Sequence, residues 1–464
     1  MANAATSPPS SGPSRLGKNA FLFIIVTVFI DMMAFAVIMP SMPELIAEML
    51  NGEAALEAAR VLKEQGNEAP FKAMIAEAIP WGGYITTVYA IMNFLAQPVL
   101  GNLSDRFGRR PVLLVSMGML AVDFVIMGLA HAIWLLFLGR FLSGISAATH
   151  STASAYISDT TEPHQRGQAF GMLGAAFGLG FTLGPALGGW LGEFDARLPF
   201  FAAAALAAIN FCYGLFVLPE SLNHEHRRKF DWTRANAFGA FKHFRKIPYL
   251  AWFLVALGLF NFAHMVYPST FNYFAEVRYA WTAGMVGTAL MVVGVSSAIF
   301  QGMFSGRIIK KVGGTRAALF GFIFGSLTFA AYAAATQGWM VFAIIPLGAL
   351  GGVLGPAMNQ IMTTRVPRNA QGELQGAIAS MQALASIFAP FTLTQTLHYF
   401  TAENAPVYFP GAAFALSAIV CALALLPLLQ GLRTVPKVEE QPADPAGEAV
   451  PEESVDPKAA PQSA

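Results

Sequence analysis

The feature that most constrains this chain is a series of twelve long apolar runs separated by polar segments. Each run has at least 18 residues, which is enough for a helix to cross the hydrocarbon core of a bilayer. In chain order, the predicted spans are 20–43, 80–100, 111–131, 133–157, 167–191, 198–219, 248–270, 282–304, 315–336, 338–361, 371–397 and 406–430. We therefore expect an all-α polytopic membrane protein.

Composition supports this class and excludes others. Of the 464 residues, 55% are hydrophobic and 12% are charged, whereas a soluble domain has roughly 45–50% and about 25%. So little charge cannot coat a globule in water, which argues against a soluble enzyme, and the apolar content argues against a disordered chain. The net charge of +1 gives no reason to expect nucleic-acid binding. Cys212 and Cys421 lie in apolar runs and indicate neither a disulfide framework nor a metal site.

The positive charges are unequally divided between alternate connecting segments. If residue 1 is cytoplasmic, 22 of the 28 Lys and Arg residues lie inside, five lie outside, and Arg140 lies within a span. Cytoplasmic loops of membrane proteins carry such an excess of Lys and Arg. We expect a multi-pass protein of the plasma membrane, the inner membrane of a bacterium, with both termini in the cytoplasm.

The polar segments divide the chain into two membrane bundles. The predicted parts are a cytoplasmic tail at 1–19, a six-helix bundle at 20–219, a cytoplasmic linker at 220–247, a second six-helix bundle at 248–430 and a disordered cytoplasmic tail at 431–464. An external loop at 44–79 is expected to form one or two short amphipathic helices, as a lid or as a neutral insertion. The basic linker either fixes the topology and contacts anionic lipid or binds a partner. No obligate protein partner is inferred.

The two bundles repeat one pattern at a constant offset of 205 residues. The pairs in register are Gly101 with Gly306, Gly108 with Gly313, Trp134 with Trp339, Gly167 with Gly372, Gly171 with Gly376 and Pro185 with Pro390. Parallel internal repeats of this kind occur in secondary transporters, where the substrate site lies between the halves near the bilayer midplane. We expect alternating access, in which one half rocks against the other.

The most specific string is GNLSDRFGRRP at 101–111, which resembles the loop motif of the major facilitator superfamily between its second and third helices. The resemblance implies twelve helices in two pseudo-symmetric six-helix bundles. It also implies that a carboxylate and arginines of this loop hold the cytoplasmic side closed. The residues carried over are Gly101, Asp105, Arg106, Gly108, Arg109 and Arg110. The alternative is a short basic loop that only fixes the topology.

A second motif lies in the fifth span, where GFTLGPALGG at 180–189 resembles the antiporter motif of drug-exporting major facilitator families. Its residues are Gly180, Gly184, Pro185, Gly188 and Gly189. Three of the glycines recur every four residues, which predicts a groove of bare backbone against which a neighbouring helix packs closely. The proline removes a backbone donor and is expected to kink the helix. The alternative is that this groove serves packing alone.

Residues 21–220 as a whole resemble the tetracycline-resistance branch of the drug:proton antiporters, with IDMMAFAVIMPSMP in the first span and GRFLSGISAATHSTASAYISDTTEP in the fourth. The C-terminal half resembles that branch less closely, through GRIIKKVG and QGELQG. Where the branch has a carboxylate in its ninth helix, this chain has Gly325, and Ser297 stands in place of a histidine in the eighth helix. These departures leave the identity of the cargo open.

Three charged residues lie deep within the predicted spans, namely Asp31, Asp123 and Arg140. A charge at a helix centre costs about 2.5–3.5 kcal/mol on the insertion scale, so such residues indicate function. Asp31 lies near the midplane, where we expect it to bind a proton in competition with cargo; the alternative is a packing carboxylate bonded to Thr27. Asp123 and Arg140 lie at matching depth on adjacent helices and either couple protons or form a structural ion pair. The resemblance implicates first-helix and third-helix carboxylates in coupling.

The C-terminal spans carry no deep carboxylate or cation but offer amide and aromatic groups. Such groups suit an amphipathic, partly aromatic cargo. The candidate residues for the cargo cavity are Asn261, His264, Tyr267, Gln301 and Gln382. For His264, the alternative is an ordinary packing role.

Taken with the resemblance, the sequence predicts a proton-coupled antiporter that exports a small amphipathic compound, a drug or tetracycline-like molecule, by alternating access. We expect no enzyme activity and no metal or cofactor, with the proton as coupling ion. A GxxxxGK(S/T) string that would indicate nucleotide hydrolysis is not found. The alternatives are a proton-coupled uptake transporter or facilitator of a small metabolite, and a sensor or scaffold without transport.

Overall fold

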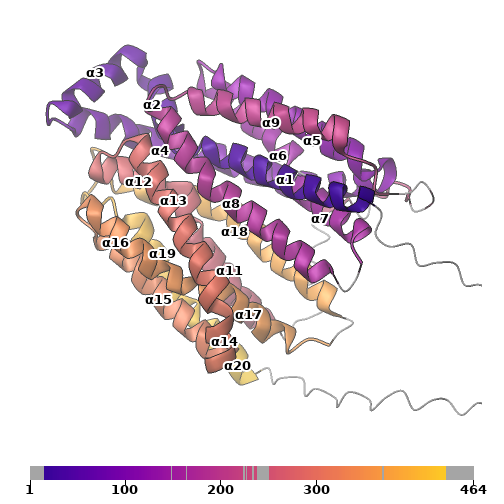
Figure 1. The fold of residues 1–464 in the computed structure, drawn as a ribbon. Helices are drawn as coiled ribbons and strands as arrows, with labels where there is room; N and C mark the ends of the chain where they lie inside the picture. Colours follow the sequence, from indigo (N-terminus) through magenta and orange to yellow (C-terminus); the bar gives the residue numbers. More distant parts are fainter. Residues whose placement is uncertain are drawn as a thin grey trace, which may run out of the picture.

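Two helical halves lie side by side in the molecule (Figure 1). The computed structural model describes residues 15–434 except 148, 163–164, 223–224, 226, 233–234, 238–249 and 368–369. We call residues 15–217 the N-half and residues 251–434 the C-half. The helices of the N-half are α1 (Arg15–Val37), α2 (Met42–Asn51), α3 (Glu53–Glu64), α4 (Ala69–Phe107), α5 (Arg109–Gly128), α6 (Ile133–Ser146), α7 (Thr149–Thr160), α8 (Arg166–Gly192) and α9 (Leu198–Val217).

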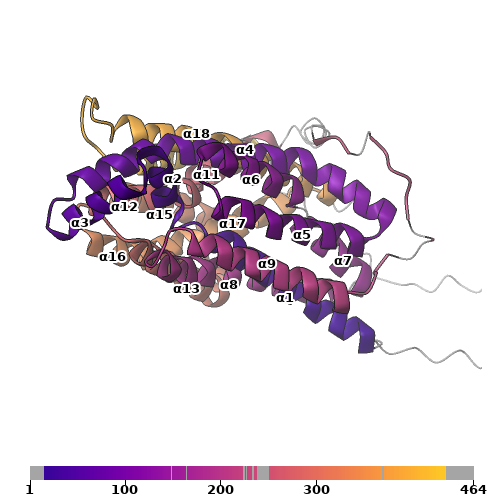
Figure 2. The ribbon, with the colours of Figure 1, turned by 90° about the horizontal axis from the view of Figure 1, so that it is seen from above.

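The C-half repeats this arrangement with more interruptions in its helices. Its elements are α11 (Ala251–His264), α12 (Val266–Tyr279), α13 (Ala283–Phe300), the π-helical turn η4 (Gln301–Ser305), α14 (Gly306–Val312), α15 (Gly314–Ala334), α16 (Gly338–Ala349), the 3₁₀ turn η5 (Leu350–Val353), α17 (Leu354–Thr363), α18 (Gln371–Tyr399), α19 (Ala412–Leu423) and α20 (Leu425–Thr434). The long helices of both halves run along one common axis (Figures 1 and 2).

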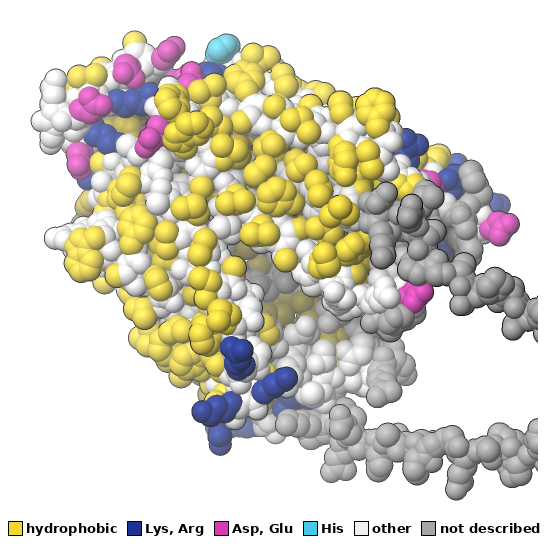
Figure 3. All heavy atoms as spheres, viewed as in Figure 1, with side chains coloured by type: hydrophobic (Ala, Val, Ile, Leu, Met, Phe, Trp, Pro, Cys, Tyr) yellow, Lys and Arg dark blue, Asp and Glu magenta, His cyan; other side chains and the backbone are white. Residues whose placement is uncertain are grey.

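The bundle has the dimensions and surface of a membrane protein. Within the described ranges, ten helices or end-to-end helix pairs are long and apolar enough to cross a bilayer, and the pair α1–α2, bent by 40°, makes eleven. The remaining predicted span lies in α4, a helix of 39 residues with more polar side chains, among them Asn93, Gln97 and Asn102. Figure 3 shows hydrophobic side chains over the middle of the visible face and charged ones gathered toward its two ends.

Several helix ends differ from the predicted spans. Helix α1 begins at Arg15, inside the predicted tail 1–19, and α4 begins at Ala69, so only the first part of the predicted loop 44–79 lies outside it. That first part forms the two short helices α2 and α3, as predicted. The described parts of the fourth span are α6 and α7, on either side of residue 148, and the seventh span continues through α12 to Tyr279.

Hydropathy misplaced these ends because it detects contact with lipid, and a helix whose polar face is covered by protein continues past the apolar run. At the C-terminus, α20 extends to Thr434. Three parts of the predicted polar segments lie outside the described residues: 1–14 of the N-terminal tail, 238–247 of the linker and 435–464 of the C-terminal tail.

The internal repeat is present in the backbone. Gly108 and Gly313 end α4 and α14 with positive φ angles of 107° and 82°, a conformation that favours glycine. Each also donates its N–H to a carbonyl four residues earlier, that of Ser104 or Ile309, over 3.1 and 2.9 Å. The offset of 205 residues therefore relates two turns of the same geometry at equivalent places in the two halves.

The glycine groove predicted on the fifth span is present in α8, and it packs against the backbone of α1. A Cβ atom built on Gly180, Gly184 or Gly188 would lie 2.5, 2.7 or 1.7 Å from a carbonyl oxygen of α1. On another side of α8, a Cβ on Gly189 would lie 2.5 Å from the carbonyl oxygen of Ala283 in α13. Bare backbone thus joins α8 both to its own half and to the C-half.

The two halves meet at one end of the bundle and part at the other. We call these the α3 end and the motif end, the latter carrying residues 101–111. Toward the α3 end, Gly82 packs against Tyr273, Gly83 packs against Thr394, and the amide of Asn272 donates to the Met39 carbonyl.

Toward the motif end, glycines of both halves have no atom of another element within 4 Å of a built Cβ. They are Gly101, Gly167, Gly171, Gly174, Gly178, Gly302, Gly306 and Gly372. In the same region the surface is hollowed between the halves (Figure 3). The structure is therefore closed at the α3 end and open at the motif end.

Candidate functional site

Asp31 is held inside the N-half by α1, where its side chain is only 7% exposed. Its carboxyl group is hydrogen-bonded to the side chain of Thr149, at the start of α7. Thr27, one turn earlier on α1, is not its partner, since the Thr27 hydroxyl has no hydrogen-bond partner within the described part of the chain. A buried carboxyl with so few polar contacts is costly to ionise unless water or a cation reaches it.

Asp123 and Arg140 are close in space but do not form the direct ion pair that matching depth made plausible. Asp123, on α5 and fully buried, accepts a hydrogen bond from Ser143 on α6, and its other oxygen has no partner among the described residues. A Cβ on Gly139 would lie 2.7 Å from that oxygen. Residues 139 and 143 share the face of α6 that meets α5, whereas residue 140 lies about 100° around the helix.

Arg140 instead points toward α1 and α4. Its guanidinium carbon lies 5.8 Å from the ring centroids of both Phe35 and Tyr89, a cation–π arrangement. Asp123 still attracts Arg140 electrostatically at longer range. Asp123 and Arg140 therefore interact electrostatically at a distance, and neither charge is neutralised by a direct salt bridge to the other.

Tyr89 lies at the centre of these groups, and sequence reasoning missed it. Its hydroxyl is within electrostatic range of Asp31, Asp123 and Arg140, and its ring lies 5.5 Å from that of Phe35. We call Asp31, Tyr89, Asp123 and Arg140 the N-half charge cluster. The sequence feature that could have identified Tyr89 is its position midway along the second span, at a depth similar to that of Asp31 in the first span.

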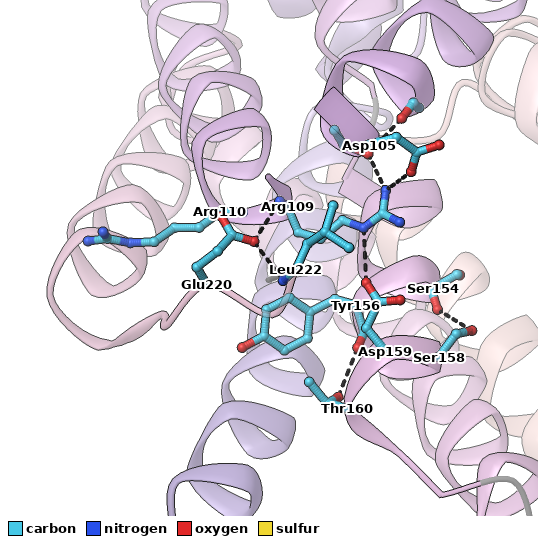
Figure 4. A network of polar contacts seen from close by, with 12 residues as sticks. Asp105, Arg109, Arg110, Ser154, Tyr156, Ser158, Asp159, Thr160, Glu220 and Leu222 are labelled. Atoms are coloured by element: carbon cyan, nitrogen blue, oxygen red, sulfur yellow. Dashed lines mark hydrogen bonds and ion pairs between the residues drawn. The ribbon is translucent and has the colours of Figure 1, made fainter. Parts of the chain in front are cut away.

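The motif at 101–111 forms a polar network within the N-half (Figure 4). The guanidinium group of Arg109 donates to Asp105 and Ser104, each at 2.6 Å, and to Asp159 at the end of α7, at 3.1 Å. Glu220, which follows α9, accepts from the backbone N–H groups of Arg109 and Arg110 at 2.8 and 3.2 Å. A carboxylate in this position stabilises the N-terminus of α5.

Not every residue of the motif joins this network. Arg106 is exposed and lies 5.0 Å from the ring centroid of Phe107, and Arg110 donates to the Leu215 carbonyl at 2.8 Å. Gly108 approaches Glu220 so closely that a Cβ would lie 2.2 Å from its carboxylate. All these partners belong to the N-half or follow it directly. The contacts therefore tie together the ends of α4, α5, α7 and α9 while the motif end is open.

In the C-half, two of the predicted cargo-cavity residues come together and the others do not. His264 lies 5.3 Å from Tyr267 and 4.8 Å from Phe260 between ring centroids, yet its side chain remains exposed. Gln301, in the turn η4, and Gln382, on α18, make no side-chain hydrogen bond to either within the described residues.

Asn261 has a buried amide nitrogen without a hydrogen-bond partner among the residues the structure places. The C-half thus offers an aromatic cluster with a histidine, and one unsatisfied amide group, that of Asn261, one turn before that histidine on α11. Within the described ranges, no group of three or more His, Cys, Asp or Glu side chains converges as metal ligands would.

The predicted absence of a deep carboxylate holds for the described middle of the C-half spans, but one carboxyl group is buried near the α3 end of the seventh span. Because the seventh span continues through α12, it includes Glu276, which is 0% exposed. At Gly325, where the resemblance would place a carboxylate, α15 is in van der Waals contact with its neighbours. Gly325 faces Cys421, 3.5 Å from a built Cβ, and lies 3.6 Å from the Cβ position of Gly351 in η5.

Two repeated halves that close at one end, with charged groups buried inside the N-half, define a helical membrane transporter of the alternating-access kind. Residues 24–390 match the Major Facilitator Superfamily, and the chain belongs to that family. The fold is therefore the predicted one, twelve helices in two pseudo-symmetric bundles.

The sequence relatives are drug-resistance proteins. The chain is 34% identical to the tetracycline resistance protein, class C, of Escherichia coli over 377 residues, which is 81% of this chain and 89% of that protein. It is 33% identical to the class B protein of Escherichia coli, over 79% and 85% of the two chains.

Solved structures share the fold at lower sequence identity. A bacterial homologue of the human lysosomal transporter Spinster, solved in an inward-facing and unoccupied conformation, has a TM-score of 0.69 at 14% identity, over 91% of this chain and 98% of that one. The human organic anion transporter MFSD10 has a TM-score of 0.62 at 19% identity, over 89% of this chain and 99% of that one.

Proposed function

We propose that this protein exports a small amphipathic compound, a drug or tetracycline-like molecule, across the bacterial plasma membrane in exchange for protons. The single observation that carries the proposal is the N-half charge cluster, in which Asp31 and Asp123 are buried inside the N-half, with 7% and 0% of their side chains exposed. Carboxylates at this depth are expensive unless they bind and release protons. Arg140 lies within electrostatic range of Asp123 but contacts the rings of Phe35 and Tyr89, so no direct ion pair opposes protonation of Asp123.

The distribution of Lys and Arg supports an orientation with the motif end in the cytoplasm. In that orientation the structure is open to the cytoplasm and closed to the outside, and both chain termini are cytoplasmic. Cargo would enter from the cytoplasm while Asp31 releases its proton. After rocking, a proton from outside would displace cargo.

The relatives support the class of cargo. Both Escherichia coli proteins named above are tetracycline resistance proteins. The chain departs from that branch at Gly325 and Ser297, so we propose an amphipathic drug as cargo and leave tetracycline as one member of the panel to be tested. The aromatic cluster around His264 and Tyr267 is suited to contact its rings.

The proton gradient is a sufficient energy source. One proton crossing 100 mV yields about 2.3 kcal/mol, and one pH unit adds about 1.4 kcal/mol. Transport by this route requires no covalent step, so the protein is proposed to be neither an enzyme nor dependent on a cofactor. Its partners would be the cargo and the surrounding lipid.

The test is a drug-susceptibility panel, including tetracycline, in an efflux-deficient bacterial host that expresses the full chain. We expect increased resistance to at least one amphipathic drug. Asp31→Asn should remove this resistance while the amount of protein in the membrane is unchanged, because an amide cannot exchange a proton. Asp195→Asn, at an exposed position near the α3 end, is the matched control and should keep full resistance. Undiminished resistance in Asp31→Asn would exclude Asp31 from the mechanism.

An uptake transporter or facilitator of a small metabolite is the alternative that the sequence analysis left open. Everted vesicles with an acidified lumen distinguish the two. An exporter should release protons from the lumen when the active drug of the panel is added, whereas an uptake transporter should not respond.

A further inference from the structure

Glu276 is a buried carboxyl group that the proposed mechanism does not use. It lies on α12 with 0% exposure, and neither of its oxygens has a hydrogen-bond partner in the described part of the chain. Among the described residues of the C-half, it is the only buried Asp or Glu. An ionised carboxylate in this state would have lost its water and gained no donor in return, which is very unfavourable.

The groups that face Glu276 come mainly from the two short helices of the N-half. Glu44 on α2, together with Arg60 and Lys63 on α3, lies within electrostatic range of its carboxyl group. On its own helix, Tyr273 is the titratable neighbour. The cluster therefore combines one further carboxyl, two cations and a phenol.

The two cations are already occupied by other partners. Arg60 forms an ion pair with Glu44 and a second one, at 3.2 Å, with Glu57. The ammonium group of Lys63 lies 4.0 Å from the ring centroid of Phe71. Burial lowers the pKa of Lys63, against the opposing attraction of Glu44 and Glu276. No ion pair within 4 Å joins Glu276 to either cation among the described side chains, so its charge is not cancelled by contact.

Glu276 lies on the seam between the halves. One turn earlier on the same face of α12, Asn272 donates to the Met39 carbonyl, and Tyr273 packs against Gly82 of α4. The Tyr273 hydroxyl has no hydrogen-bond partner in the described structure and lies within electrostatic range of Arg140. When the halves separate at the α3 end, this face of α12 moves away from the N-half. Glu276 then becomes accessible to the external solution.

We propose that Glu276 is a second proton-binding site, distinct from Asp31, whose protonation is required for the halves to close at the α3 end. The proton comes from external water as the end closes and returns to external water as it opens. It does not cross the membrane. The proposal rests on the proposed function for the orientation and for the alternation between two states.

The sign of the pH dependence follows from burial. The closed state buries Glu276 without a donor, so it favours the neutral carboxylic acid, and the open state, in which water solvates the group, favours the carboxylate. Raising the external pH therefore shifts the protein toward the state open at the α3 end. Linkage to a single proton changes this equilibrium by up to about tenfold per pH unit. External acid would favour the return to the cytoplasm-facing state, which is the direction an exporter needs after it has released its cargo.

The test measures opening of the α3 end directly. Ala283, on α13, is 2% exposed and packs against Gly189 of the other half, so Ala283→Cys reports separation of the halves there. The reporter is placed in full-length protein carrying Cys212→Ser and Cys421→Ala, reconstituted in liposomes and labelled from outside with a membrane-impermeant maleimide between pH 5 and 8. Labelling of Ala54→Cys, exposed on α3, corrects for the pH dependence of the thiol reaction.

With Glu276 present, corrected labelling of the reporter should rise with external pH. Glu276→Gln, and independently Glu276→Met, should keep labelling low and constant, because neither side chain can ionise. Using both variants guards against a folding defect of one. Glu77→Gln, at an exposed position on α4, is the matched control and should behave like the parent. A pH dependence that survives in both Glu276 variants would overturn the proposal.

Combining these variants with Asp31→Asn separates this inference from the proposed function. If Glu276 is a proton site, the Asp31→Asn protein should keep a pH-dependent labelling that Glu276→Gln removes. If Asp31→Asn alone abolishes the pH dependence, the Glu276 site is refuted while proton coupling through Asp31 stands. If resistance is unaffected by Asp31→Asn but labelling still depends on Glu276, the mechanism proposed for Asp31 fails and the Glu276 site stands.

Discussion

At the scale of single residues, Tyr89 determines how Arg140 is held. The guanidinium group lies against the rings of Tyr89 and Phe35, from two different helices, and makes no direct ion pair with Asp123. A cation–π contact fixes the position of a cation without removing its charge. Arg140 can therefore keep its positive charge within electrostatic range of Asp123, one of the two carboxyls proposed to exchange protons.

Substitution of Tyr89 should separate the role of its ring from that of its hydroxyl. Tyr89→Phe keeps the aromatic face, and we expect the thermal stability of the purified protein to stay close to that of the parent. Tyr89→Leu removes the face and should cost about 1–2 kcal/mol, the usual worth of a desolvated cation–π contact. Thermal unfolding in detergent measures the difference. Equal stability of the two variants would show that the ring does not hold Arg140.

At this scale the sequence predicted which residues are buried charges better than it predicted their partners. Asp31, Asp123 and Arg140 were found because a charge in an apolar run is conspicuous. Their contacts depend on how neighbouring helices are rotated about their axes. On α6, residue 139 faces Asp123, whereas residue 140 points about 100° away from it. Glu276 was missed because it lies beyond the apolar run that was used to delimit the seventh span.

At the scale of elements, α8 shows how one helix serves two interfaces. The carbonyl oxygens of α1 occupy the space that side chains would need at Gly180, Gly184 and Gly188, and α13 approaches at Gly189. The predicted groove was therefore correct, since a spacing of four residues places glycines on one helical face. Its partner helix could not be predicted, because the spacing describes only one side of the contact.

Two substitutions on α8 test this packing against an internal control. Gly188→Ala would place its Cβ 1.7 Å from the carbonyl oxygen of Val37, and such overpacking costs about 1–3 kcal/mol. Gly178→Ala has open space around it and should be neutral or stabilising by up to about 1 kcal/mol, because alanine is the better helix former. The thermal unfolding temperature should fall for Gly188→Ala and should be unchanged or higher for Gly178→Ala. A stable Gly188→Ala protein would contradict the close contact between α8 and α1.

At the scale of the whole molecule, the described contacts between the two halves run from the α3 end to about the middle of α8, where a Cβ on Gly294 would lie 2.1 Å from the Thr182 hydroxyl. Helices α8 and α13 meet there through bare backbone, and a Cβ on Gly287 would lie 2.3 Å from the Pro185 carbonyl oxygen. The division into two repeated halves was predictable from the offset of 205 residues. Which end is closed was not, because the same sequence must support both states.

Gly287→Ala should shift the balance between those states. The clash affects only the state closed at the α3 end, and a cost of about 1–3 kcal/mol corresponds to a population shift of about 5- to 150-fold. Spin labels on Gly171→Cys and Gly372→Cys, one in each half at the motif end, should then show shorter distances. Gly306→Ala, a position with open space, is the control. An unchanged distance distribution for Gly287→Ala would mean that this contact does not set the equilibrium.

The position of α3 has a practical consequence for inhibition. Helix α3 projects from the N-half at the same end of the molecule as α12 of the C-half (Figure 1). In the proposed orientation, both are presented to the extracellular medium. An antibody fragment raised against this composite epitope would clamp the two lobes together and arrest efflux from the cell exterior, with no need to penetrate the lipid or to compete with the drug being expelled.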